Sequence, residues 1–276
     1  MAGKLYIVGT PIGNLSDFSP RAVETLETVD FIAAEDTRVT VKLLNHFGIK
    51  KPMISYYEHN KTGRGNDIID RLTAGEVCAL VSDAGMPAIS DPGEDLVRLC
   101  HENNIPVESV PGPTALTTAL AIAGMKTGRF CFEGFLSVNK PSRKAHLEEL
   151  RCEKRTMVFY EAPHKLVATL KDMKEYFGER NIALVRELTK LHEQVMHLTF
   201  TEAIELYSGE QSPKGEFVLI VSGYEEKEDS HSYTIEEAVK IARDYISDGN
   251  SASTAAKMAA SDTGFRKNDI YRLLND

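Results

Sequence analysis

Short apolar runs alternate with helical periods through the first half of the chain. Each run is four or five residues long and lacks strict polar alternation, as expected of strands buried on both faces. Glycines close several of the helical periods, and Ser19-Pro20 has the N-cap and first-turn residues of a helix start. Five strands that alternate with helices predict a mostly parallel α/β sheet. The predicted strands are Lys4–Val8, Phe31–Ala34, Met53–Tyr56, Val77–Val81 and Val107–Val110.

After Gly124 the pattern changes, because apolar runs follow one another with few helical periods between them. We expect only two helices of any length here, near residues 144–152 and 165–177. Neighbouring strands without a crossover helix pair antiparallel, so the pattern predicts a second domain with a mixed sheet. Its strands are predicted at Phe130–Glu133, Met157–Tyr160, Ile182–Val185, Val195–Leu198 and Phe217–Val221.

The last fifty residues differ from both of these parts. Residues 224–232 are mostly polar and charged, which is typical of a linker. Thr234-Ile-Glu-Glu237 is a capping box, and three short helical periods follow it, near 238–246, 252–260 and 270–274. A chain of 276 residues suits two domains and an appendage. We expect an α/β domain over 1–118, a mixed α/β domain over 119–223, a linker over 224–233 and a helical, helix-turn-helix-like module over 234–276.

Composition narrows the class of protein. Charged residues make up 26% and hydrophobic residues 42% of the chain, which is typical of a globular protein. No apolar run approaches the length of a membrane span, and a strand follows the amino terminus at once, so we expect no signal peptide and a cytoplasmic location. The four cysteines form no Cys-x-x-Cys pair, and we interpret them as buried thiols.

The segment most indicative of a ligand site is Val81–Gly93, at the end of the predicted buried strand Val77–Val81. It contains two prolines, two aspartates and two glycines. In open α/β sheets, ligands bind where loops leave the carboxyl ends of strands. Backbone groups that have no partner in a sheet can hydrogen-bond a polar ligand there. We therefore expect a small-molecule site at this loop.

Eight phrases in fixed order carry a resemblance to a known family. They are Val8-Gly-Thr-Pro-Ile-Gly-Asn-Leu15, Ala34-Glu-Asp-Thr-Arg38, Ser55-Tyr-Tyr-Glu-His-Asn60, Ser82-Asp-Ala-Gly-Met-Pro-Ala-Ile-Ser-Asp-Pro-Gly93, Val110-Pro-Gly-Pro-Thr-Ala115, Phe159-Tyr-Glu-Ala-Pro-His164, Arg186-Glu-Leu-Thr-Lys190 and Lys214-Gly-Glu-Phe217. From Lys4 to about Val221, the chain closely resembles the small-subunit ribosomal RNA methyltransferase I family of the tetrapyrrole methylase superfamily. Tyr57, Met86 and Lys165 depart from the expected His, Thr and Arg.

The resemblance implies two α/β domains of the tetrapyrrole methylase type with the cofactor cleft between them, and a homodimer. It implies 2′-O-methylation of a cytidine ribose in small-subunit (16S) ribosomal RNA, with S-adenosyl-L-methionine as cofactor and no metal. Carried over residue by residue, it places Ile12, Asp83, Met86, Thr114 and Ala115 on the first-domain wall of the cleft, and Phe159, Tyr160, Leu188, Gly215 and Glu216 on the second.

Several residues of these phrases also have a purely structural interpretation. Gly9 and Gly13 match neither the dinucleotide fingerprint nor a P-loop, so alone they indicate turns. Asp83 could cap the helix at Gly93 or brace its own loop, and Thr114 could be a helix N-cap. Phe159 and Leu188 are core residues by ordinary burial habits.

A ribose hydroxyl is a poor nucleophile and benefits from a general base, while RNA phosphates favour Arg and Lys. Asp36 and Arg38 could receive the ribose and a phosphate, although such a pair at a helix start often forms a capping salt bridge. Glu58, His59, Glu161 and His164 complete the catalytic candidates.

The net charge of −9 disfavours binding of RNA, whose phosphates are negatively charged, but basic residues are concentrated in parts of the chain. Residues 139–146 hold the densest basic segment, and the RNA-binding candidates are Lys140, Arg143 and Lys144, with Arg266 and Lys267 in the carboxyl-terminal helices. Two alternatives stay open. The helices could make the protein a nucleic-acid-binding regulator, or the acceptor could be a tetrapyrrole or a modified protein side chain. Tetrapyrrole members usually have Gly-Asp-Pro where this chain has Ser82-Asp-Ala84.

Overall fold

The computed structural model describes residues 3–209, 215–226 and 233–275. The chain divides into two compact units, Met1–Tyr224 and Glu225–Asp276. Most of the expected linker, residues 227–232, lies outside the described residues. Lys214, which opens the last of the eight phrases, lies outside them as well.

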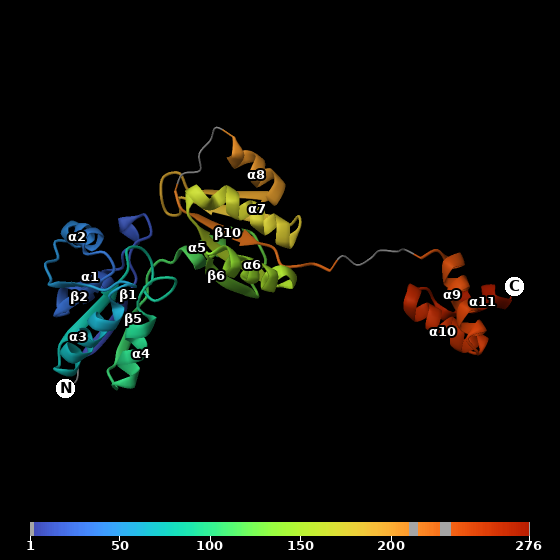
Figure 1. Cartoon of the computed structure of the whole chain (residues 1–276), viewed down its shortest axis with the longest axis horizontal. Coiled ribbons are helices and arrows are strands. Elements are labelled where there is room, and N and C mark those ends of the chain that lie inside the picture. Colours follow the sequence, from blue (N-terminus) through green and yellow to red (C-terminus); the bar gives the residue numbers. More distant parts are fainter. Residues whose placement is uncertain (1–2, 210–214, 227–232, 276) are drawn as a thin grey trace. The chain divides into compact units, whose positions relative to one another are not determined.

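The first sheet was predicted to be mostly parallel and is parallel throughout, with the strand order β3-β2-β4-β1-β5. Its strands are β1 (Lys4–Val8), β2 (Phe31–Ala34), β3 (Met53–Ser55), β4 (Val77–Val81) and β5 (Val107–Val110). The helices that connect them are α1 (Pro20–Thr28), α2 (Thr37–His46), α3 (Lys61–Thr73) and α4 (Glu94–Glu102), and a short 3-10 helix covers Leu15–Asp17 (Figure 1).

Helices cover both faces of the inner strands β2 and β4, which explains why these strands are apolar throughout. In β2, Phe31 packs into a cluster with α3 and α4, while the next residue, Ile32, packs with α1 and α2 on the other face. Successive side chains of a strand point to opposite faces, so a strand between two helical layers needs apolar residues at every position. The carboxyl ends of all five strands meet at one edge, where the loops after β1, β2, β4 and β5 come together.

The second sheet is mixed, with the order β6-β7-β10-β8-β9 and one parallel pair, β6 with β7. The strands are β6 (Phe130–Phe135), β7 (Thr156–Glu161), β8 (Asn181–Arg186), β9 (Gln194–Thr199) and β10 (Phe217–Val221). The helices are α6 (Lys140–Glu149), α7 (Leu166–Phe177) and α8 (Phe200–Ser208), and two 3-10 turns cover Leu150–Cys152 and Pro163–Lys165.

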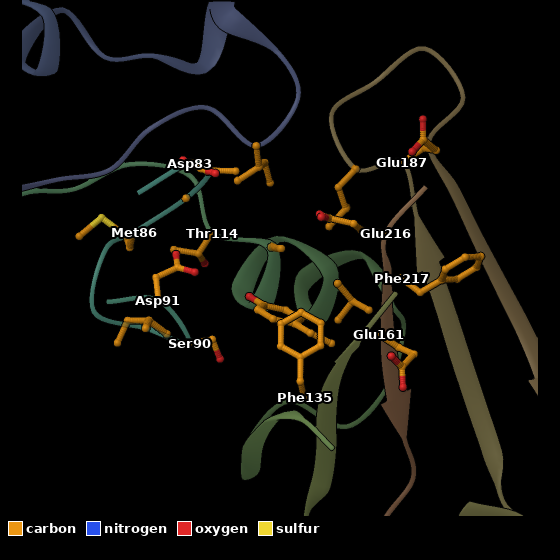
Figure 2. Close-up of a pocket in the computed structure, with 18 of the residues that line it drawn as sticks. Asp83, Met86, Ser90, Asp91, Thr114, Phe135, Glu161, Glu187, Glu216 and Phe217 are labelled. Carbon is orange, nitrogen blue, oxygen red and sulfur yellow. The ribbon is translucent and has the colours of Figure 1, made fainter. Parts of the chain in front are cut away.

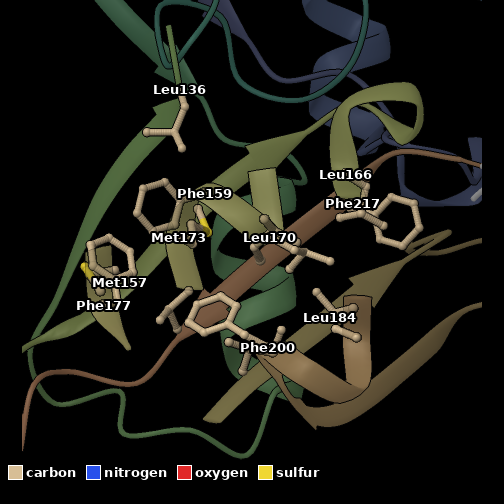
Figure 3. Packing of buried hydrophobic residues seen from close by; sticks show 14 of the residues in the cluster. Leu136, Met157, Phe159, Leu166, Leu170, Met173, Phe177, Leu184, Phe200 and Phe217 are labelled. Atoms are coloured by element: carbon tan, nitrogen blue, oxygen red, sulfur yellow. The ribbon is translucent and has the colours of Figure 1, made fainter. Parts of the chain in front are cut away.

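The expectation of only two helices in this part is wrong, because α8 is a third. Thr199 and Glu202 form a reciprocal capping box at its start, and Phe200, Ala203 and Tyr207 bury one face. Together with α7, this face packs on the sheet and forms the largest apolar cluster around Phe159, Leu170 and Phe217 (Figure 3). The helix was not predicted because its apolar positions span only about two turns, which is a short signal for a helical period.

Helix α5 (Ala115–Ile122) joins the two sheets. Its N-cap is Thr114, as the structural interpretation predicted, and its side chain accepts a hydrogen bond from the Thr117 amide. The buried Ala119 and Leu120 pack against the face of the second sheet that α7 and α8 leave open. The helix crosses the expected boundary at residue 118, so it ties the carboxyl edge of the first sheet directly to the second.

The carboxyl-terminal unit contains α9 (Ile235–Ser247), α10 (Ala252–Thr263) and α11 (Lys267–Asn275). Its core consists mainly of alanines, whose small side chains let the helices approach closely, together with Val239 and Ile270. Gly264, with φ of 75°, ends α10 in the left-handed conformation that glycine adopts at low cost. In the described part of the chain, no helix combines the length and apolar character needed to cross a membrane.

The interpretation of the cysteines holds only in part. Cys78 and Cys100 are buried and Cys131 is half-buried, but Cys152 is exposed. Cys152 is the last residue of the 3-10 turn Leu150–Cys152, in which only Leu150 is buried.

Candidate active site

A cavity of about 230 Å³ lies between the loops at the carboxyl edge of the first sheet and the facing ends of the second. In Figure 2, Asp83, Met86, Asp91 and Thr114 lie on one side of it, and Glu187, Glu216 and Glu161 on the other. Its lining residues are Ile12, Glu35, Asp83, Ala84, Gly85, Met86, Ile89, Ser90, Asp91, Thr114, Ala115, Phe135, Tyr160, Glu161, Glu187, Leu188, Lys190, Glu216, Phe217 and Val218.

The loop after β4 forms much of the first wall and is held by backbone bonds. The Thr10 amide donates to the Gly85 carbonyl at 2.8 Å, and the Gly85 amide donates back to the Thr10 carbonyl at 3.1 Å. Ala88 and Ser90 adopt left-handed φ angles of 67° and 61°, which cost energy for residues with a Cβ. Strained residues of this kind cluster at ligand sites, because the surrounding structure fixes the loop in one conformation.

The loops after β1 and β5 approach each other so closely that only glycines fit. A Cβ atom on Gly112 would lie 2.8 Å from three backbone atoms of Gly9. A Cβ atom on Gly9 would in turn lie 2.7 Å from the Gly112 Cα and from the Met86 sulfur. These glycines therefore serve close packing at the site wall, and an ordinary turn does not account for them.

Two carboxylates cross-link the loops after β2 and β4. The Asp36 amide donates to Asp83 Oδ1 at 3.1 Å, and the Asp83 amide donates to the Glu35 carboxylate at 3.3 Å. Burial raises the pKa of both Glu35 and Asp83, and the charges of neighbouring carboxylates add to it. Asp83 thus braces the loop after β2 as well as lining the cavity, while α4 begins at Gly93 without a side-chain cap.

Asp91 is the most perturbed carboxyl group of the cavity. Burial raises its pKa to about 6, the negative charge of Glu35 adds to the shift, and a hydrogen bond with Ser82 opposes it. Asp83 and Glu216 raise the pKa further. Glu35 and Asp91 both lie in the phrases that carried the family resemblance, so their position in the sequence was the available signal. Sequence reasoning nevertheless assigned neither of them to the site.

The second wall is anchored by Tyr160. Its hydroxyl accepts a hydrogen bond of 2.8 Å from the Leu116 amide at the start of α5. Its ring lies 4.9 Å from the ring of Phe132 and 5.5 Å from that of Phe135. Glu187, with a left-handed φ of 53°, pairs with Lys190 at 3.0 Å on the loop that follows β8.

The structure brings eight of the ten predicted cofactor-binding residues to the cavity. They are Ile12, Asp83, Met86, Thr114, Ala115, Tyr160, Leu188 and Glu216. Phe159 does not reach it, because successive residues of β7 alternate between the two faces and its side chain, 1% exposed, packs under α7. Gly215 directly precedes Glu216 with a φ of 77°, and a Cβ there would collide with the Glu187 side chain.

Among the six catalytic candidates, only Glu161 lines the cavity. It is 4% exposed and accepts hydrogen bonds from the Ala162 amide and the Thr169 hydroxyl. Asp36 caps α2 through the Arg38 amide at 2.8 Å and pairs with the Arg38 guanidinium at 2.6 Å. Arg38 lowers the pKa of Asp36 to about 2. This arrangement is the capping salt bridge of the structural interpretation.

The remaining catalytic candidates lie away from the cavity. Glu58 pairs with Lys61 at 2.8 Å, and His59 borders a separate depression with Asn60 and Arg64. His164 is exposed in the 3-10 turn after β7. In the described part of the chain, no group of three or more His, Cys, Asp or Glu side chains is arranged to hold a metal ion.

Three of the RNA-binding candidates lie on α6. Lys140 and Lys144 are exposed there, but Arg143 is held by Asp172 and the Thr169 hydroxyl, with a side chain only 13% exposed. Arg266 and Lys267 lie in the carboxyl-terminal unit, where the Lys267 ammonium donates to the Ser253 hydroxyl at 2.9 Å.

Comparison with known proteins gives concordant matches. The family model of tetrapyrrole (corrin/porphyrin) methylases matches residues 4–204. The chain is 49% identical to a ribosomal RNA small subunit methyltransferase I of Synechocystis, over 98% of this chain and 97% of that one. It is 48% identical to a protein of the same name from Thermotoga maritima, over 81% of this chain and all of that one.

Among solved structures, the fold is similar to a uroporphyrin-III C-methyltransferase of Thermus thermophilus complexed with S-adenyl homocysteine. The TM-score is 0.55 at 16% identity, and the match covers 80% of this chain and 97% of that one.

Proposed function

Because the chain belongs to the tetrapyrrole methylase family, we propose that it methylates small-subunit ribosomal RNA with S-adenosylmethionine, and that the acceptor is the ribose 2′-hydroxyl of a cytidine. The observation that carries the proposal is 49% identity, over nearly the full length, to a relative named as a methyltransferase of this RNA. The acceptor atom follows from the family resemblance of the eight phrases.

The cavity suits S-adenosylmethionine by the charge of its lining. The cofactor supplies a methyl group on a positively charged sulfonium. The carboxylates of Glu35, Asp83 and Asp91 on one wall and Glu216 on the other surround the space with negative charge, which favours a cation. The loops after β4 and β5, which lie outside the sheet, would offer backbone hydrogen bonds to the polar parts of the cofactor.

Asp91 is the best proton acceptor that the cavity provides. A general base works best when its pKa lies near the operating pH, and Asp91, with a pKa of about 6, meets this condition better than Asp36 at about 2. Glu161 already accepts two hydrogen bonds in the core, so in our proposal it orients the turn after β7. Holding the ribose in line with the transferred methyl group would contribute most of the remaining rate.

RNA phosphates would contact the protein outside this acidic cavity. Lys140 and Lys144 on α6 are exposed cations and would hold phosphates there, whereas Arg143 keeps α6 attached to α7 through Asp172. Arg266 and Lys267 would add a second contact. The match to the Thermotoga relative spans all of that protein but only 81% of this chain. The first compact unit, Met1–Tyr224, makes up the same share, 224 of 276 residues. That agreement supports an accessory role for the carboxyl-terminal helices.

The proposal includes a cytoplasmic homodimer, in line with the family resemblance. Sedimentation equilibrium of the full chain tests the dimer directly: a mass near 61 kDa, twice the 30.6 kDa of one chain, is expected. A mass of one chain at micromolar concentration would contradict it.

The activity is tested by transfer of labelled methyl groups from S-adenosylmethionine. The acceptors are protein-free small-subunit RNA, small-subunit particles and a porphyrinogen as control. We expect label in one of the two RNA samples, recovered after nuclease digestion as 2′-O-methylcytidine. Label only in the porphyrinogen would favour the tetrapyrrole alternative, and label on a base would overturn the ribose assignment.

A further inference from the structure

Two large apolar side chains stand exposed at the acidic cavity. Phe135, at the end of β6, is 56% exposed, and Ile89, on the loop after β4, is 50% exposed. Both line the cavity, whose other walls carry the carboxylates described above. Exposed apolar side chains at a concave site mark a place where a ligand covers them.

The backbone fixes Phe135 in this position. The pairing of β6 with β7 shifts by one residue between Phe132 and Gly134, and Gly134 has a left-handed φ of 61°. The loop after β4 comes close there, since a Cβ on Gly134 would lie 3.1 Å from the Ser90 hydroxyl. A bulge of this kind re-aims the side chain that follows it, and here it turns Phe135 toward the cavity (Figure 2).

One edge of the Phe135 ring is supported and the rest is open. The ring lies 5.5 Å from that of Tyr160 at an interplanar angle of 63°. Tyr160 is itself fixed by the hydrogen bond of its hydroxyl to the Leu116 amide. A ring held in one orientation loses little conformational entropy when a flat ligand stacks on it.

Charge selects which part of an RNA can reach this ring. The carboxylates of Glu35, Asp91 and Glu216 repel a phosphate from the cavity, whereas a neutral nucleobase meets no such barrier. Lys140, five residues after Phe135, begins α6 and is exposed. The chain therefore offers an attractive site for the phosphate outside the cavity and an apolar one for the base within it.

We propose that Phe135 is the stacking platform for the nucleobase of the acceptor nucleotide, with Ile89 as a second apolar contact. This inference rests on the proposed RNA methylation. Specific recognition of single-stranded RNA commonly stacks an unpaired base on an aromatic side chain, and the stacked base here fixes its ribose beside the methyl donor.

The first test replaces Phe135 by Ala. Stacking of one base on an aromatic ring changes affinity by about 5- to 150-fold, so kcat/KM for the RNA substrate should fall by that factor. The dissociation constant for S-adenosylmethionine should stay within about twofold. Phe135→Tyr should restore kcat/KM, because it keeps the ring. Phe130→Ala is the matched control, since Phe130 is 38% exposed on the same strand and does not line the cavity.

A second test does not depend on the stability of the Ala variant. The chain contains no tryptophan, so Phe135→Trp introduces a single tryptophan at the proposed platform, whose fluorescence can be excited apart from that of the tyrosines. Small-subunit ribosomal RNA should quench its fluorescence in a saturable manner, and a Phe130→Trp control should be quenched far less. An RNA that carries an abasic ribose at the mapped acceptor position should abolish the quenching at position 135.

Two results would overturn the inference: wild-type kcat/KM in Phe135→Ala, or equal quenching at positions 130 and 135. If the wild-type protein transfers no methyl group to either RNA sample, the proposed function fails and the inference fails with it. If Phe135→Ala methylates RNA as well as the wild type does, the stacking inference is refuted while the proposed RNA methylation stands.

Discussion

Replacement of Asp91 by Asn should lower the methylation rate and raise the stability of the fold at the same time. Asn has nearly the shape of Asp and can still accept a hydrogen bond, but it cannot take up a proton at neutral pH. If Asp91 is the general base, its loss should lower the single-turnover rate by about 10²- to 10⁴-fold. In the wild-type protein, the rate should rise with pH and level off above about pH 6, following the pKa of Asp91.

The gain in stability follows from the sign of the pKa shift. The pKa of Asp91 rises from 3.8 in the unfolded chain to about 6 in the fold, so the folded state binds more protons between these values. Stability from this group is therefore fully present below about pH 4 and is lost as pH rises through 6. A shift of about two units corresponds to about 3 kcal/mol. Since the side chain is only half-buried, solvent screening reduces this to about 1 kcal/mol.

Thermal unfolding and rapid-quench methylation measure the two effects. At pH 7.5 the melting temperature of Asp91→Asn should exceed that of the wild type by about 2–4 °C, and near pH 4 the two should coincide. Glu94→Gln is the control, because it removes a carboxylate three residues away that does not line the cavity, and its rate should not change. An Asp91→Asn protein that melts earlier and methylates at the normal rate would refute the reasoning.

Three further predictions follow from the same site. S-adenosylmethionine at about 100 times its dissociation constant should stabilise the fold by about 2.7 kcal/mol, with and without a chelator; a chelator that abolishes binding in calorimetry would contradict this. Gly112→Val puts side-chain atoms against the Gly9 backbone, and a displacement of the site wall that costs about 1–3 kcal/mol in binding should weaken cofactor affinity by about 5- to 150-fold. Gly128→Val, with open space around it, should not weaken it, and equal losses of affinity and stability in Gly112→Val would favour a purely structural role. Replacement of Lys140 and Lys144 by Gln should weaken RNA binding and reduce its dependence on salt concentration without changing cofactor affinity. An unchanged salt dependence would show that these lysines of α6 do not contact RNA phosphates.

The amino-acid sequence by itself determined the first sheet and the edge at which the site lies. Val77–Val81 has no polar position because helices cover both of its faces, and the Pro- and Gly-rich segment after it cannot continue either a strand or a helix. Such patterns are local, so they can be interpreted without knowledge of the fold. Helix α8 was not predicted because it is only nine residues long, although Phe200, Ala203 and Tyr207 recur at helical spacing.

Only the tertiary structure decided which members of each phrase reach the cavity. Glu35 lines it, but its neighbour Asp36 turns to Arg38 and caps α2. Tyr160 lines it, but Phe159 points to the opposite face of β7. Adjacent residues of similar chemistry carry the same local signal, and a strand buried on both faces shows no polar alternation that marks one of them. The direction of each side chain is set by the pairing of strands and by contacts between segments far apart in the chain, which the sequence of either segment alone does not contain.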